Sequence, residues 1–394
     1  MKNLRDKFSK ALKRNRMSVD PVPRAPITDN KPTLSWERGE PSLQPYCSFD
    51  NGIWNALNPS TSSKNPTADL PSQFRVISWN IDAFARFGPQ RMAGALEHLE
   101  TLYTNTSAAK TGPLVIFLQE MTVDDLHLIQ ETDWVRKDFY ITDLTALYWE
   151  DYVYGTTTLV EKSAAIERVF RVHYEKTRMG RDGLFVDLAI QPKVLGRTEG
   201  QQTLEGQAAA PVCKILRLCN THLESLVSDP PIRPTELKAA SRFLHPATKG
   251  DGQTTSAIPA PHAGIIAGDL NAFAPEDADI VPENSLHDTY LSLGGEEDTE
   301  PGYTWGMQSL RQYPVGRKPH GRLDKVLYCG GANPKSLERI GVGLKVDAAK
   351  GLFELRKANG EVGPEDEPFE QWTWVTDHLG LMADFELVES ESSD

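Results

Sequence analysis

The stretch Ala263-Gly264-Ile265-Ile266-Ala267-Gly268-Asp269-Leu270-Asn271 decides the fold class of this chain. Its small and apolar first residues predict a buried strand, and Gly268 lets the backbone turn sharply where that strand ends. Asp269 and Asn271 then point to the same side, because side chains of an extended chain repeat every two residues. The carboxylate can accept a proton from water, and the amide can donate to a phosphoryl oxygen. An Asx-type turn also explains this motif when it stands alone.

Four further polar motifs have the same character, namely Ser78-Trp79-Asn80-Ile81-Asp82, Leu118-Gln119-Glu120, Thr221-His222-Leu223-Glu224-Ser225 and Thr376-Asp377-His378. Four of the five motifs directly follow an apolar run that predicts a buried strand. We therefore expect a row of Asn, Glu, His and Asp side chains at one rim of one sheet system. Such a row suits a hard metal ion and a phosphate group.

Glu120 ends an apolar strand that begins near Pro113. A carboxylate in that position costs free energy unless it is paired or binds a cation. Magnesium prefers oxygen ligands and keeps several of its waters, so one or two carboxylates are enough to hold it. An ordinary exposed strand end is the alternative interpretation of this glutamate.

Two histidines, His222 and His378, follow a hydroxyl residue and an acid. A lone histidine is more often structural than catalytic. The Asp377-His378 pair, however, supplies a metal-facing acid and a group that can stabilise charge on a phosphorane. Asp324 is a candidate partner that fixes the tautomer of His378, and Asn80 adds a neutral donor. Each signal is weak alone, but core packing does not explain the ordered set.

From residue 73 onward the pattern alternates between strands and helices. Helices are expected at 89–103, 123–131 and about 234–244, and loops at 195–211 and 246–262. Strands are expected at 74–79, 113–118, 153–161, 166–174, 183–191, 212–220, 263–268, 322–328, 339–346 and 380–387. Because strands dominate, the sequence predicts an α/β fold with two packed sheets and helices outside.

Residues 1–72 differ from the rest of the chain. Residues 1–16 hold seven Lys or Arg against Asp6, and Leu4, Phe8 and Leu12 recur at helical spacing. A basic amphipathic helix and a frayed, solvated tail are both consistent with this pattern. Its functional interpretations are a nuclear import signal around residues 13–16 or a mitochondrial presequence. Residues 20–72 are rich in Pro, Ser, Asn and Thr and predict an extended or disordered linker.

The bulk composition excludes several classes of protein. A formal net charge of −13 argues against a general nucleic-acid coat protein, so contact with nucleic acid should be local. No apolar run is long enough for a membrane span, and no signal-peptide pattern is found. The four cysteines form no C-x-x-C pair, which argues against zinc and redox sites and suits a reducing compartment.

The ordered motifs resemble the endonuclease/exonuclease/phosphatase superfamily. Further segments, Thr177-Arg178-Met179, Tyr303-Thr304-Trp305 and Arg322-Leu323-Asp324, are most similar to its tyrosyl-DNA phosphodiesterase 2 group, over roughly residues 73–387. The resemblance implies a DNase I-like, four-layer α/β/β/α sandwich with a catalytic domain at 73–390, preceded by a largely disordered tail at 1–72. One difference follows the Gly-Asp-x-Asn motif. Many relatives have a basic residue two positions after the asparagine, whereas this chain has Ala272-Phe273-Ala274, and Arg178 or Arg181 are candidates to replace that cation.

The resemblance also implies roles for individual residues. It implies Mg²⁺ or Mn²⁺ held by Glu120 with Asp377, and an attacking water positioned by Asp269 with Asn271. His378, oriented by Asp324, would stabilise the transition state, while His222 and Asn80 would hold the phosphate. Arg178 and Tyr154 are further candidates near the phosphate, and Trp305 could form an apolar wall against a nucleotide.

The function implied by the resemblance is a metal-dependent phosphodiesterase that acts on DNA 5′ ends. Its most specific form removes a tyrosyl adduct from a 5′-phosphate during DNA repair. DNA 5′ ends or protein–DNA adducts would be its partners, the chain would be a monomer, and its location would be the nucleus, with the mitochondrion or cytoplasm as alternatives. The rival functions are a phosphatase or phosphodiesterase on inositol-lipid or nucleotide substrates, and an inactive binding scaffold.

Overall fold

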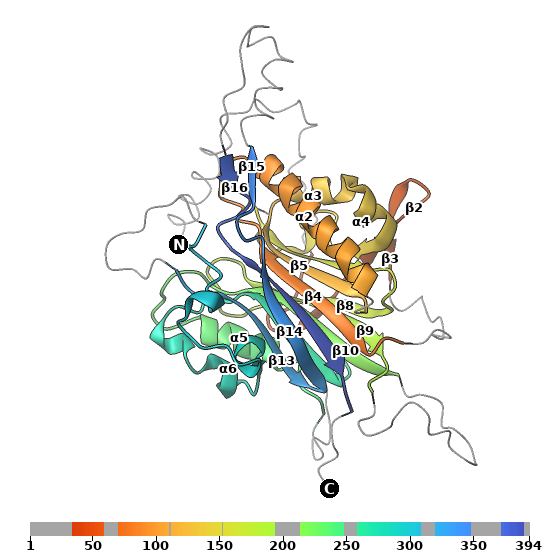
Figure 1. Cartoon of the computed structure of the whole chain (residues 1–394). Coiled ribbons are helices and arrows are strands. Elements are labelled where there is room, and N and C mark those ends of the chain that lie inside the picture. Colours follow the sequence, from red (N-terminus) through yellow and green to blue (C-terminus); the bar gives the residue numbers. More distant parts are fainter. Residues whose placement is uncertain are drawn as a thin grey trace, which may run out of the picture.

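The computed structural model describes residues 34–58, 70–109, 112–151, 153–193, 213–247, 258–308, 320–347 and 372–389. Within these ranges, two large mixed β-sheets pack face to face, and helices cover their outer faces (Figure 1). This arrangement is the four-layer α/β/β/α sandwich, so the predicted fold class is confirmed.

The first sheet has seven strands in the order β1-β8-β9-β10-β11-β13-β12. Strands β10 and β11 are parallel, and every other neighbouring pair is antiparallel. Its strands are β1 (Pro41–Leu43), β8 (Ile166–His173), β9 (Asp182–Ile190), β10 (Lys214–His222), β11 (Ala263–Asp269), β12 (His287–Asp288) and β13 (Asp324–Gly330).

The second sheet has eight strands in the order β14-β17-β4-β5-β7-β6-β2-β3. Strands β4 and β5 form its parallel pair. Its strands are β2 (Tyr46–Asp50), β3 (Ile53–Leu57), β4 (Gln73–Asn80), β5 (Leu114–Met121), β6 (Phe139–Ile141), β7 (Gly155–Glu161), β14 (Ala332–Ile340) and β17 (Gly380–Leu387). A separate two-stranded ribbon pairs β15 (Lys345–Asp347) with β16 (Trp372–Trp374).

Helices α2 to α4 pack on the second sheet, and α5 and α6 pack on the first (Figure 1). The α-helices are α2 (Gly88–Ala109), α3 (Val123–Glu131), α4 (Asp133–Asp138), α5 (Arg233–Ser241), α6 (Ile280–Glu283) and α7 (Thr289–Ser292). Short 3₁₀ turns are η2 (Ala146–Tyr148), η3 (Pro275–Asp277) and η4 (Glu300–Gly302). The helices expected from the sequence at 89–103, 123–131 and 234–244 are all found, although α2 continues to Ala109 and α5 ends at Ser241.

The central strands are buried on both faces, which explains why their sequences are apolar without interruption. In β4, Val76 faces the layer between the two sheets, whereas its neighbour Ile77 faces the helices. In β11, Ile265 and Ile266 divide in the same way. Because successive side chains point to opposite faces, one apolar run supplies two core layers and leaves its polar end residues at the rim.

The expectation of a linker across residues 20–72 is wrong for part of that segment. Residues 41–57 form β1, which pairs with β8, and the β2–β3 hairpin, which extends the second sheet. The hairpin turns at Asn51-Gly52, where both residues have positive φ, 54° and 83°. Asn-Gly is the strongest short hairpin signal, and the Pro- and Ser-rich surroundings concealed it. Residues 1–33, with the proposed basic helix, and residues 59–69 lie outside the described part of the chain.

The strand expected at 339–346 is also wrong. Strand β14 instead ends at Ile340, and a turn at Gly341 and Gly343, with φ of 74° and 73°, separates it from β15. Strand β14 lies at a sheet edge and contains Pro334 beside an irregularity in its pairing with β17. An edge position tolerates proline and polar residues, so this strand lacks the apolar pattern that marks the central ones. Within the described ranges, no helix is long and apolar enough to cross a membrane.

Candidate active site

The polar motifs meet at one edge of the sandwich because of strand direction. Strands β4 and β5 run parallel, as do β10 and β11, so their carboxyl ends lie at the same edge. His222 and Asp269 are directly paired across β10 and β11, and Asp269 is paired with Asp324 at the start of antiparallel β13. Residues 376–378 end two residues before the start of β17, which runs antiparallel to β4. Strand direction alone therefore brings the predicted side chains to one edge of the sandwich.

Asn80 links the two sheets at the centre of the site. Its Nδ2 lies 3.1 Å from Oδ2 of Asp269 and 3.3 Å from Oε1 of Glu120. Its Oδ1 accepts a hydrogen bond from the backbone N–H of Asp82. The amide therefore donates to two carboxylates that come from different sheets and holds them close to one another.

Glu120 has the geometry of a residue held for function. Its backbone φ is +54°, in the left-handed region that non-glycine residues seldom adopt. Its Oε2 accepts from the backbone N–H of Ala83, and its Oε1 lies 3.9 Å from Nε2 of His222. Burial, together with the Asp82 carboxylate, raises the pKa of Glu120 to about 7. A bound cation would offset both the cost of burying the Glu120 carboxylate and its repulsion by Asp82.

The donor set fits a divalent metal ion. Glu120, His222 and Asp269 each offer one ligand atom, and these atoms lie within 4.8 Å of one another. The two carboxylates match the oxygen ligands that Mg²⁺ and Mn²⁺ prefer in proteins, and His222 borders them. Asp377, the second predicted metal ligand, is not part of this group, and its Oδ2 accepts a hydrogen bond from Nε1 of Trp305 at 3.3 Å. Its Oδ1 nevertheless lies 3.9 Å from Nε2 of His378, so Asp377 borders the site.

Asp324 orients His378 at the other side of Asp269. Nδ1 of His378 lies 2.8 Å from Oδ2 of Asp324, and Nε2 lies 3.7 Å from Oδ2 of Asp269. The backbone of His378 is also fixed, because its carbonyl accepts from Nε1 of the fully buried Trp79. Burial by itself lowers the pKa of His378, but the carboxylates of Asp324 and Asp269 outweigh it and raise that pKa well above its usual value. His378 is therefore an imidazolium aimed at Asp269.

His222, in contrast to His378, is neutral. Its Nδ1 lies 2.9 Å from Nη1 of Arg181, and a guanidinium can only donate. Nδ1 must therefore accept, which leaves the proton on Nε2, 3.4 Å from Oδ2 of Asp269. Burial, with the positive charges of Arg181 and His378, lowers the pKa of His222 well below its usual value. The ring is a neutral donor that faces the carboxylates.

The cation beside His222 is Arg181, one of the two arginines that the sequence offered as a replacement cation. Arg178 is exposed, and its backbone N–H donates to Oε2 of Glu224. Arg181 is buried, and its guanidinium also lies 5.3 Å from the centre of the Tyr154 ring. Tyr154 in turn contacts His222 edge-on, with ring centroids 6.4 Å apart. The sequence placed a basic residue in this loop but did not show which of the two arginines turns inward.

Asn271 supports the site through the loops around it. Its Nδ2 donates to the carbonyl of Leu223 at 3.2 Å and to Oγ of Ser225 at 3.4 Å. Its backbone N–H donates to Oδ1 of Asp269 at 2.9 Å. Because both amide hydrogens are engaged with the loop, Asn271 acts on Asp269 through its backbone.

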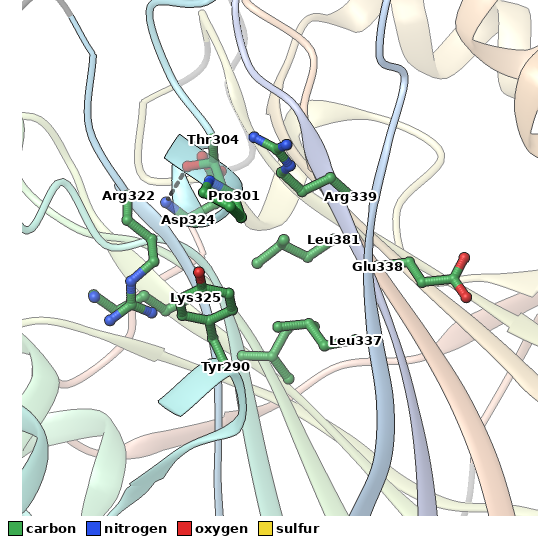
Figure 2. A pocket seen from close by; sticks show the side chains of 12 residues that line it. Tyr290, Pro301, Thr304, Arg322, Asp324, Lys325, Leu337, Glu338, Arg339 and Leu381 are labelled. Atoms are coloured by element: carbon green, nitrogen blue, oxygen red, sulfur yellow. Dashed lines mark hydrogen bonds between the residues drawn. The ribbon is translucent and has the colours of Figure 1, made fainter. Parts of the chain in front are cut away.

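A cavity of about 90 Å³ adjoins Asp324 (Figure 2). Oγ1 of Thr304 accepts from the backbone N–H of Asp324, as the dashed line in Figure 2 shows. Arg322, at the cavity wall, donates to Asp288 at 2.7 Å. The lining does not include Glu120, His222 or Asp269. The cavity therefore adjoins Asp324, which orients His378, and is separate from the group of Glu120, His222 and Asp269.

The geometry agrees with a comparison of the sequence with known families. The model of the Endonuclease/Exonuclease/phosphatase family matches residues 77–378, which is most of the chain. The chain belongs to this family. The resemblance drawn from the ordered motifs is thereby confirmed, and the family places the chain among hydrolases with the endonuclease/exonuclease/phosphatase fold.

Solved structures of the same family share the fold. Zebrafish (D. rerio) TDP2, complexed with single strand DNA product, has 18% sequence identity and a TM-score of 0.50, over 80% of this chain and 100% of that chain. TDP2 from Caenorhabditis elegans also has 18% identity and a TM-score of 0.50, over 80% of this chain and 74% of that chain. No curated protein sequence matches the chain.

Proposed function

We propose that the chain is a Mg²⁺- or Mn²⁺-dependent phosphodiesterase that acts on DNA 5′ ends and hydrolyses 5′-tyrosyl-DNA bonds. The observation that carries the proposal is the joint position of Glu120, Asp269, His222 and His378 at one strand edge. Neutral His222 and the His378 imidazolium lie within ion-pair range of Asp269, and the Glu120 carboxylate lies within 4.8 Å of the ligand atoms of Asp269 and His222. Core packing gives no reason to bury such a group.

The metal would be held by Glu120, with His222 and Asp269 adjacent and Asp377 nearby. When bound, it would polarise a phosphoryl oxygen and offset the charge that develops on the phosphorus centre. The remaining chemistry is assigned to the protein's own side chains.

Asp269 is the proposed base for the attacking water. Burial raises the pKa of its carboxyl to about 6, and a base works best when its pKa is near the working pH. The backbone N–H of Asn271 and Nδ2 of Asn80 fix its two oxygens. This fixed carboxylate can accept the proton of a water that attacks the phosphorus in line.

Two donors stabilise the phosphoryl oxygens in this proposal. Nε2–H of His222 is held in its tautomer by Arg181, and His378 is charged because Asp324 and Asp269 favour its imidazolium form. Donors that are already oriented at the developing charge lower the barrier without further reorganisation. Asn80 supports the site by holding the carboxylates of Glu120 and Asp269 close together.

The DNA substrate is supported by the resemblance of the motifs to the tyrosyl-DNA phosphodiesterase 2 group and by the DNA product in the zebrafish structure of the same fold. Arg181 supplies a buried cation beside His222, and Trp305 lies against Asp377, where a nucleotide could pack. A role in DNA repair in the nucleus, as a monomer, belongs to the same proposal. The acidic net charge of −13 disfavours the rival substrate class of inositol lipids, because anionic membranes attract basic surfaces.

The test is release of tyrosine from a 5′-tyrosyl oligonucleotide by the purified protein with Mg²⁺. Asp269→Asn should lower kcat by about 10²–10⁴-fold, the usual contribution of a general base. Glu131→Gln, at the exposed end of α3, is a matched control and should leave the rate unchanged. Release of phosphate from inositol phosphates with no action on DNA ends would support the rival phosphatase. Full activity of Asp269→Asn would contradict the assignment of Asp269 as the base and of this cluster as the active site.

A further inference from the structure

Three apolar side chains at the rim of the site are exposed. Phe273 is 49% exposed, Leu226 is 48% exposed and Val227 is 67% exposed. Phe273 lies two residues after Asn271, and Leu226 lies four residues after His222. Single exposed apolar residues are ordinary, but a group that borders a polar site marks a place where a ligand packs. We call these three residues the rim patch.

Arg233 joins the two loops that carry the rim patch. Its Nη1 donates to the carbonyl of Leu226 at 2.7 Å, and its guanidinium lies 4.5 Å from the centre of the Phe273 ring. Asn271 adds a second link through Oγ of Ser225. Leu226 has a φ of 70°, a strained value for a branched side chain, and the bond from Arg233 holds it there. These contacts fix the two loops relative to each other, so the rim patch has a defined arrangement.

The rim patch does not suit a phosphate group. Arg233 is 3% exposed, and its Nε and Nη2 donate to the carboxylate of Asp277. Its Nη1 donates to the carbonyls of Glu224 and Leu226. The positive charge is thus neutralised by Asp277, and the guanidinium serves as a support for one face of the ring. What the patch offers to a ligand is an aromatic face and two aliphatic side chains.

We propose that the rim patch is a stacking platform for an unpaired base of the DNA strand whose 5′ phosphate is cleaved. The inference rests on the proposed function, because a strand bound at Asp269 carries its bases past the neighbouring loops. Every base has a flat face that stacks on an aromatic ring without regard to sequence. Phe273, already supported by Arg233, is ordered for this contact before the strand binds.

The experiment measures binding of 5′-phosphorylated single-stranded oligonucleotides with Mg²⁺ by fluorescence anisotropy. One set of oligonucleotides lacks a single base at the first, second or third nucleotide. Phe273→Ala should weaken binding of the intact strand roughly 5- to 150-fold, the range for one base on an aromatic side chain, whereas Phe273→Trp should bind as the wild type does. Removal of the stacked base should weaken the wild type by a similar factor and leave Phe273→Ala unaffected.

Controls separate this inference from folding and from the proposed function. Because Phe273 is half exposed, Phe273→Ala should unfold at the wild-type temperature, and Leu291→Ala, at an exposed leucine of α7, should not change binding. Equal binding of the intact strand by Phe273→Ala and wild type would overturn the platform. So would a loss seen only with a 5′-tyrosyl group, which would assign the patch to the tyrosine. Strand binding with no hydrolysis of 5′-tyrosyl ends would instead overturn the proposed function and leave the platform standing.

Discussion

Arg181 and His222 are joined by a 2.9 Å contact between Nη1 and Nδ1, although they lie 41 residues apart in the sequence. The contact decides which nitrogen of His222 carries its proton, because the guanidinium has no acceptor. The active form of this histidine therefore depends on a residue that is not itself placed against Asp269.

Arg181→Ala should release His222 from its tautomer. The loss of a positioned donor is expected to lower kcat by about 100-fold. The pKa of His222 should also rise, because the charge of Arg181 contributes to its depression. Nitrogen NMR of the imidazole would report both changes in the absence of substrate. An unchanged tautomer in the variant would contradict this account of Arg181.

Gly268→Ala should damage both fold and site. Gly268 has a φ of 153°, and an added Cβ would lie 1.7 Å from the carbonyl oxygen of Thr221 on the neighbouring strand. The parallel pair that presents His222 and Asp269 must then separate. We expect a loss of about 3 kcal/mol or more in the free energy of unfolding.

Gly343→Ala is the matched control for Gly268→Ala. Its φ of 73° is also positive, but nothing lies within 4 Å of an added Cβ. Its cost should be only about 1 kcal/mol, the usual penalty for the left-handed conformation. Equal losses in the two variants, measured by urea unfolding, would show that crowding against Thr221 is unimportant.

Mg²⁺ should stabilise the folded chain in the absence of substrate. A ligand at one hundred times its Kd adds about 2.7 kcal/mol to the free energy of unfolding. Glu120→Gln should abolish that gain, because it removes the carboxylate at the centre of the proposed metal site. Thermal unfolding with and without Mg²⁺ would measure the effect, and the exposed Glu131→Gln variant should retain it. A full Mg²⁺ response in Glu120→Gln would assign the metal to other ligands.

The rim residues of the central strands were predictable from sequence for a simple physical reason. Apolar runs such as the one before Asp269 allow only a strand that is buried on both faces, and the first polar residue must then lie at its end. Parallel neighbours place such ends at one edge, so Glu120 and His222 follow the same logic. The motifs therefore predicted where the side chains gather.

Contacts that depend on loops were not predictable in this way. Which arginine turns inward is decided by the turn at Gly180, with a φ of 68°, and by the start of β9 at Asp182. Neither leaves a periodic signal, so Arg181 was only one of two candidates. The β2–β3 hairpin had a signal in Asn51-Gly52, but its strands are short and half exposed. The Pro- and Ser-rich composition of the segment therefore favoured the prediction of a linker over that of a hairpin.

Glu236 should make stability depend on pH. This residue of α5 is 1% exposed, and burial raises the pKa of its carboxyl to about 8, although the backbone N–H of Glu224 opposes the rise. In the unfolded chain the carboxyl ionises near pH 4.5. Between these values the unfolded state releases a proton that the folded state keeps, so stability falls as pH rises from about 4.5 to 8.

Glu236→Gln should remove that part of the pH dependence. The amide oxygen can still accept from the backbone N–H of Glu224, which Oε2 of Glu236 binds at 2.7 Å, and it carries no proton to lose. At about 1.4 kcal/mol for each pKa unit, the variant should gain on the order of 4 kcal/mol over the wild type at pH 8 and nothing near pH 4.5. Urea unfolding of both proteins across this range isolates Glu236, because Asp269, Glu120 and His378 titrate equally in each. Parallel curves would mean that Glu236 is ionised in the folded chain.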